Sequence, residues 1–208
     1  GLWFKFLVVW RFARLWALAD GVCPPENMNR CMSNNFTVRG FWRAWHRSFN
    51  RWLVRYVFIA IGGSHGVSLP RHLASILIVF MFVAVWHEPG LVTWNFDMLR
   101  MFAWAWLMFL FMMPEVVAEQ VYRLPPVQTF VKQHPVLDRH AKALGGALCI
   151  EMLMVANLIG YSYGLEGAQE LLKSCSQRGM TLFMAAYTSG LFAAAQVMMY
   201  IRRFESSK

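Results

Sequence analysis

The stretch that decides the fold is the apolar run LASILIVFMFVAVW at residues 73–86, followed directly by His87 and Glu88. Its fourteen residues are fewer than the ~20 that an α-helix needs to cross a bilayer. Extending the helix as far as Trp94 gives a sufficient length and places both ionisable residues at membrane depth. We expect Pro89 to kink or end this helix. The sequence therefore predicts a transmembrane helix that carries a histidine and a glutamate.

The overall composition supports a membrane location. The chain is 58% hydrophobic and 15% charged, with a mean hydropathy of +0.39. Soluble domains are about 45–50% apolar and about 25% charged. The 20 lysines and arginines exceed the 11 acidic residues, which gives a net charge of +9, but the basic residues lie at the edges of apolar runs rather than on a polar module. This pattern predicts contact with membrane lipids and argues against a nucleic-acid partner.

The remaining segments predict an all-α fold, a multi-pass transmembrane helical bundle. We expect four to five spans together with amphipathic or re-entrant helices. Because the chain opens on Gly1 inside an apolar segment, we expect residues 1–208 to be the C-terminal part of a single domain whose earlier spans lie upstream. The expected segments are spans at 2–19, 96–113 (stopped by Pro114), 141–161 and 180–200, a mixed interfacial or re-entrant stretch at 115–139, and a polar loop at 166–178.

An unusual amphipathic helix is predicted over residues 39–56, ended by Ile61-Gly62-Gly63. Aromatic residues recur along it in steps of three and four, and arginines recur at every fourth position, with His46 and Asn50 at the border. The arginines could bind the phosphates of a nucleotide-bearing substrate or simply meet lipid headgroups. The aromatic residues are Trp42, Trp45, Phe49, Trp52 and Tyr56, and the arginines are Arg39, Arg43, Arg47, Arg51 and Arg55.

His87 is the strongest candidate for chemistry. An ionisable residue inside a span suggests function, because its desolvation must be compensated. A neutral imidazole can accept the proton of an alcohol that attacks an acyl carbonyl. A histidine that is simply hydrogen-bonded to a neighbouring helix is the equal alternative. The cysteines show no CxxC pair and no zinc-finger spacing, so no metal site is predicted.

Two motifs together resemble a known family. The first is FWRAWHRSFNRW at residues 41–52, and the second is the pair Trp86-His87 at the end of an apolar run. In this order they resemble the signature of the membrane-bound O-acyltransferase family. The upstream segment PPENM at residues 24–28, followed by Arg30 and Cys31, is similar to the glycerol-uptake-protein subgroup, which is related to hedgehog acyltransferase.

This resemblance implies a bundle of spans around a tunnel where acyl-CoA, as co-substrate, meets a hydroxyl-bearing acceptor, with no bound cofactor. It implies His87 as the base and His46 as the second catalytic residue. The acceptor implied is a lipid such as a lyso-glycosylphosphatidylinositol in the endoplasmic reticulum membrane. A polyol uptake transporter and an inactive membrane scaffold remain as alternatives. The substrate-binding residues expected are Arg43, Arg47, Arg51, Trp42, Trp45, Asn50 and Trp86.

Overall fold

The computed structural model of the chain describes residues 2–31, 34–63, 66–87, 96–175 and 177–206. Within these ranges the regular structure is helical throughout, without a β-strand. The α-helices are α1 (Leu2–Ala19), α2 (Val38–Ala44), α3 (Arg47–Leu53), α4 (Leu69–His87), α5 (Phe96–Tyr122), α6 (Pro125–Gln133), α7 (Pro135–Leu158), α8 (Gly164–Cys175) and α9 (Arg178–Ser206). Two π-helices, η1 (Val54–Phe58) and η2 (Ile159–Tyr163), continue α3 and α7.

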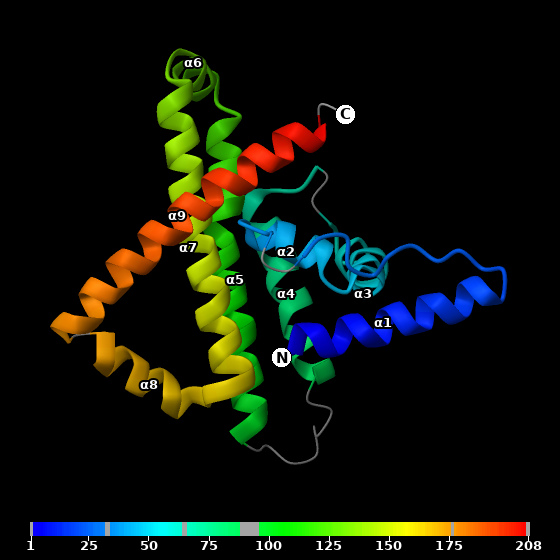
Figure 1. Cartoon of the computed structure of the whole chain (residues 1–208). Coiled ribbons are helices and arrows are strands. Elements are labelled where there is room, and N and C mark those ends of the chain that lie inside the picture. The colour runs from blue at the N-terminus through cyan, green and yellow to red at the C-terminus, as the bar shows by residue number, and fades with distance from the viewer. Residues whose placement is uncertain (1, 32–33, 64–65, 88–95, 176, 207–208) are drawn as a thin grey trace.

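Helices of membrane-spanning length confirm the predicted fold class. Among the described residues, four segments are long and apolar enough to cross a bilayer. The protein is therefore an all-α, multi-pass membrane protein. The first helix, α1, is not one of the four, and it lies across the direction of α4, α5 and α7 (Figure 1). The four segments are Leu69–His87, Leu99–Tyr122, Pro135–Tyr163 and Gly179–Glu205.

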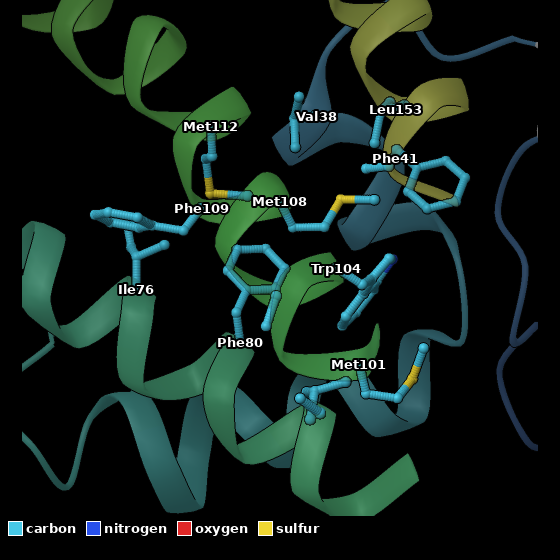
Figure 2. Close-up of a cluster of buried hydrophobic side chains, with 14 of the residues drawn as sticks. Val38, Phe41, Ile76, Phe80, Met101, Trp104, Met108, Phe109, Met112 and Leu153 are labelled. Atoms are coloured by element: carbon cyan, nitrogen blue, oxygen red, sulfur yellow. The ribbon is translucent and has the colours of Figure 1, made fainter. Parts of the chain in front are cut away.

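The core lies around α5, whose apolar side chains meet three other helices. Trp104 and Met108 of α5 are fully buried. Figure 2 shows them between Phe80 of α4 on one side and Phe41 of α2 and Leu153 of α7 on the other. Helix α4 packs along α5, and α7 packs against both α5 and α9. This packing fixes α2, α4, α5 and α7 relative to one another, and these are the helices that build the site.

The α4 span is offset from its expected position. The sequence predicted a helix over residues 73–94, but the helix begins at Leu69 and ends at His87. Pro70 lies in the first turn, where proline is favoured because its missing N–H has no intrahelical partner. The extra length is therefore added before residue 73 and not after His87. Glu88 and Pro89 lie outside the described residues.

Two other boundaries correct the sequence-based prediction. Helix α5 does not stop before Pro114 but continues to Tyr122. Met112 and Val116 are buried on either side of the proline, so tertiary packing holds the helix together across the missing hydrogen bond. The expected polar loop at 166–178 is mostly the helix α8, an amphipathic segment with a Glu170–Lys173 ion pair of 2.7 Å.

Candidate active site

A large, mostly apolar cavity of about 1790 Å³ runs along one face of α4. The α4 residues that line it recur mostly at steps of three and four, with two adjacent pairs, as expected for one broad side of a helix. From His72 in the first turn to His87 at the end there are fifteen residue steps, or roughly 22 Å at 1.5 Å per residue. The cavity is therefore an elongated apolar channel. Its α4 lining consists of Leu69, His72, Ile76, Val79, Phe80, Val83, Trp86 and His87.

His87 lines one end of this channel as the last residue of α4. Its ring lies edge-on to three aromatic rings, with centroid distances of 5.1 Å to Trp86, 6.4 Å to Trp104 and 5.9 Å to Tyr161. Tyr161 is positioned by the π-helical turn η2 at the end of α7. The imidazole is thus presented to the cavity by α4 and contacts one ring of α5 and one of η2, while His87 remains exposed.

His46 lines the same cavity from a sharp break in the chain. The single helix predicted over residues 39–56 does not form, because α2 ends at Ala44 and α3 begins at Arg47. His46 joins them in the left-handed conformation, with φ 44° and ψ 55°. A non-glycine residue rarely adopts this backbone conformation, and when it does the site is often functional.

Contacts from a distant loop stabilise this break. The backbone carbonyl of Asn27 accepts a hydrogen bond of 2.9 Å from the Arg47 N–H. The side-chain Oδ1 of Asn27 accepts another of 2.8 Å from the Ser48 N–H. These are donors at the N-terminus of α3 that no helical carbonyl can satisfy. The loop therefore caps α3 and starts a new helix after His46.

Aromatic rings connect the two histidines. The ring of His46 lies 5.3 Å from Phe49, which stacks on Trp86 at 4.7 Å, and Trp86 lies 5.1 Å from His87. Trp10 of α1 covers the other side of His46 at 5.0 Å. Burial lowers the pKa of His46, a backbone hydrogen bond opposes this effect, and the charge of nearby His87 adds to the lowering. His46 is therefore a neutral imidazole at neutral pH.

Most of the other predicted site residues come together at this cavity. Its lining includes the predicted residues Trp42, Trp45, Asn50, Trp86 and Arg43. Burial leaves the indole Nε1 of Trp42 without a hydrogen-bond partner in the described part of the chain. An acceptor atom of a bound molecule would satisfy this donor.

The predicted row of arginines is split. Arg43 lines the cavity, whereas Arg47 and Arg51 are not among its lining residues. The break at His46 changes the helical phase, so the later arginines no longer share a face with Arg43. The guanidinium of Arg47 instead donates a hydrogen bond of 2.9 Å to Asn29 Oδ1, and Arg51 is exposed.

Arg43 also borders a second, smaller cavity of about 210 Å³. Arg30 and Arg202 line this cavity as well, together with Asn29 and Asn35. Asn35, like Arg43, lines both cavities. Three guanidinium groups around a small concave space favour an anionic ligand such as a phosphate. This cavity, which the sequence did not reveal, adjoins the end of α2.

The end of the channel near His72 carries a polar cluster that was not predicted from the sequence. Arg39 forms an ion pair with Glu119, which also receives a hydrogen bond of 2.7 Å from Arg123. The Nδ1 atom of His72 is buried and has no hydrogen-bond partner among the residues described. All four residues line the cavity, so its apolar length ends in charged groups. The signal in the sequence was the spacing of His72, which shares the α4 face with Val79 and Trp86.

Within the described ranges, no group of histidine, cysteine, aspartate and glutamate residues is arranged to hold a metal ion. The groups available for chemistry at the cavity include imidazoles, guanidinium groups, indoles, amides, the carboxylate of Glu119 and the phenol of Tyr161.

Comparison with known proteins identifies similar sequences. The family model for "MBOAT, membrane-bound O-acyltransferase family" matches residues 1–158. The "Membrane-bound O-acyltransferase GUP1" of Saccharomyces cerevisiae is 41% identical over 206 residues, covering 98% of this chain and 33% of the relative. The Schizosaccharomyces pombe protein of the same name is 40% identical over 202 residues, covering 96% of this chain and 31% of the relative.

A more distant relative is the "Protein-cysteine N-palmitoyltransferase HHAT" of Mus musculus. It is 32% identical over 158 residues, covering 74% of this chain and 30% of the relative. The chain spans about a third of the length of each of these curated relatives.

Proposed function

The chain belongs to the membrane-bound O-acyltransferase family, and we propose from this premise that it carries the reaction centre of an acyl-CoA-dependent O-acyltransferase. The proposed reaction transfers a fatty acyl group to a hydroxyl of a lipid acceptor. The observation that carries this proposal is that His46, at the break between α2 and α3, and His87, at the end of α4, line one elongated apolar cavity.

In the proposed reaction, His87 is the general base. Its neutral imidazole accepts the proton of the acceptor hydroxyl while the hydroxyl oxygen attacks the thioester carbonyl carbon. The tetrahedral intermediate collapses by breaking the carbon–sulfur bond. The imidazolium of His87 then returns the proton to the leaving thiolate, which gives free CoA and the new ester. Because a thioester is already activated, the sequence of steps needs neither an acyl-enzyme nor a bound cofactor.

His46 has a different role in this scheme. The carbonyl oxygen gains negative charge as the acceptor attacks, and a preorganised donor in a site that excludes water stabilises that charge strongly. A neutral imidazole can donate one hydrogen bond, and His46 is neutral and lines the cavity. The unpartnered Nε1–H of Trp42 is a second candidate donor on the same wall.

The phosphate groups of the acyl donor are assigned to the small arginine-lined cavity. Arg43 and Asn35 border both this cavity and the channel, so a thioester near His46 could extend its nucleotide end toward Arg30 and Arg202. Guanidinium groups bind phosphates through paired, charge-assisted hydrogen bonds. In this proposal Arg47 and Arg51 do not contact the nucleotide.

The acyl chain is assigned to the channel along α4. Val79 and Val83 lie on its lining between the two ends. Burying alkyl carbons against these side chains is favourable by about 0.8 kcal/mol for each methylene group. The ion-paired cluster of Arg39, Glu119 and Arg123 marks the end of the apolar stretch. A chain that reached this cluster would have to desolvate charged groups, so the channel sets an upper limit on chain length.

For the acceptor we propose a lipid hydroxyl, such as that of a lyso-glycosylphosphatidylinositol in the endoplasmic reticulum membrane. The support is the resemblance of residues 24–31 and 41–52 to the glycerol-uptake-protein subgroup, together with a cavity on a membrane-spanning helix.

The test is an acyl-transfer assay on the full-length protein, using a long-chain acyl-CoA and a panel of lysolipid acceptors. His87→Ala should reduce kcat by about 10²–10⁴-fold, the usual contribution of a general base. His140→Ala is the matched control, because His140 of α7 contacts Gln196 and Phe192 and is not among the cavity-lining residues.

Full turnover by the His87 variant at normal expression would contradict the base assignment. Glycerol uptake into vesicles without an acyl donor would favour a transporter, and a wild-type protein inactive with every acceptor would favour a scaffold.

A further inference from the structure

Asn27 lies in the loop between α1 and α2 and contacts three consecutive residues of the break. Its backbone carbonyl bonds to the Arg47 N–H and its Oδ1 to the Ser48 N–H. Its side-chain Nδ2 lies 3.4 Å from Nδ1 of His46. One side chain therefore contacts both the cap of α3 and the imidazole ring.

The Ser48 contact fixes which way the Asn27 amide faces. A backbone N–H can only donate, so the amide atom that it meets at 2.8 Å must be the oxygen. The amide nitrogen, which is only a donor, is then the atom that faces His46 Nδ1. Nδ1 can accept this hydrogen bond only if it carries no proton. The hydroxyl of Ser48, also 3.4 Å from Nδ1, can donate to the same atom.

An unprotonated Nδ1 determines the state of the whole ring. In a neutral imidazole one nitrogen carries the proton, so the proton must be on Nε2. Burial has the largest effect on the pKa of His46 and lowers it against the opposing backbone hydrogen bond, which favours the neutral form. Around the ring, Trp10 of α1 and Phe49 of α3 are apolar neighbours, and His87 of α4 is the titratable group whose charge acts on it.

We propose that Asn27 is a positioning residue that holds His46 as the Nε2–H tautomer. This proposal rests on the proposed function and deepens it. With its proton on Nε2, His46 can donate a hydrogen bond to the thioester oxyanion but cannot accept a proton there. The two histidines therefore have different roles, with His46 as the hydrogen-bond donor and His87 as the general base.

Asn27→Asp is the informative variant. An aspartate can still accept the Ser48 N–H, so the cap of α3 is kept. Its second oxygen, however, accepts a hydrogen bond and so favours a proton on Nδ1, which leaves Nε2 unprotonated in the neutral ring. The carboxylate also favours the imidazolium, which carries protons on both nitrogens.

Activity of Asn27→Asp should therefore become strongly dependent on pH. At high pH the neutral ring lacks its Nε2 donor, and kcat should fall by about 10²-fold, as for the loss of one oxyanion donor. As the pH falls and the ring becomes an imidazolium, the donor returns and most of the loss should be recovered. The wild-type protein should lack this alkaline loss. Gln196→Glu is the control, because it makes the same amide-to-carboxylate change 2.8 Å from a histidine ring, that of His140, and neither residue lines a cavity.

An Asn27→Asp protein with wild-type kcat and an unchanged pH profile would overturn the proposal. A second measurement is independent of catalysis: the ¹⁵N chemical shifts of the imidazole in the full-length protein, assigned with His46→Gln. We expect the proton on Nε2 in the wild type and on Nδ1 in Asn27→Asp at high pH. A wild-type proton on Nδ1 would contradict the proposal even if the protein is an active acyltransferase. A proton on Nε2 in an inactive protein would contradict only the proposed function.

Discussion

The indole Nε1 of Trp104 donates a hydrogen bond of 3.2 Å to Oδ1 of Asn157, which joins α5 to α7 beside His87. The amide of Asn157 is itself oriented, because its Nδ2 donates a 2.8 Å bond to the Leu153 carbonyl. The indole is fully buried and lies edge-on to both Phe80 and His87. The hydrogen bond therefore fixes a wall of the cavity against which His87 is placed.

Replacing Asn157 should destabilise the protein through this contact. Asn157→Leu leaves a buried indole N–H without an acceptor, at a cost of about 1–3 kcal/mol. We expect a Tm lower by several degrees in detergent, measured by tryptophan fluorescence. Adding Trp104→Phe removes the stranded donor, so the double variant should lose less than the sum of the single losses. Strict additivity of the two losses would contradict the role of this hydrogen bond.

Narrowing the channel should change the preferred acyl chain. Val79 lines the cavity about halfway along α4, so Val79→Trp should obstruct long chains and leave space for short ones. We expect the ratio of kcat/KM for stearoyl-CoA to that for octanoyl-CoA to fall at least about tenfold, equivalent to about 1.4 kcal/mol. Ile78→Trp is the control, because Ile78 is 48% exposed and does not line the cavity. Equal effects of Val79→Trp and Ile78→Trp on this ratio would indicate that the acyl chain does not lie in the channel.

Removing Arg43 should weaken binding of the acyl donor rather than the chemical step. Arg43 borders both cavities, so Arg43→Ala should raise the KM for acyl-CoA about tenfold and change kcat little. The increase should shrink at high salt, which screens phosphate contacts. Arg51→Ala serves for comparison, since that side chain is exposed and outside both linings. A larger increase in KM for Arg51→Ala than for Arg43→Ala would contradict this assignment and favour the unbroken arginine row that the sequence predicted.

Stability should respond to the protonation of His46. Burial lowers its pKa in the folded protein below the value of 6.5 that it has when unfolded. Between these two pKa values the unfolded chain binds more protons, so stability rises with pH through this window and is lost as pH falls below 6.5. Tm measured from about pH 5 to pH 8 should therefore rise less steeply for His46→Asn than for the wild type. An unchanged slope in His46→Asn would contradict this prediction.

The spans were predictable because composition and length decide them. The runs at 141–161 and 180–200 lie within α7–η2 and α9, as expected from their length and high mean hydropathy. Helix boundaries predicted from local sequence were wrong where packing against residues distant in sequence outweighs the local preference. Pro114 does not end α5, because Met112 and Val116 are packed on both sides of it.

The candidate site shows the same limit. The spacing of residues 39–56 predicted one helix, since nothing in that segment indicates that Asn27, nineteen positions before His46, would cap a second helix. The histidines were found because they stand out in apolar or aromatic surroundings. Arg30, Arg202 and His72 were missed because only the packing of α2, α4 and α9 brings them to the cavities.

The left-handed backbone at His46 has a thermodynamic consequence. An L-amino acid in this conformation costs roughly 1–2 kcal/mol, a penalty that glycine largely escapes. His46→Gly would therefore relieve the backbone strain and also remove the imidazole. The residue that stabilises this turn best is thus one without a functional group. Under the proposed mechanism this strain has a purpose, because glycine would stabilise the backbone at this turn but could not donate a hydrogen bond to the oxyanion.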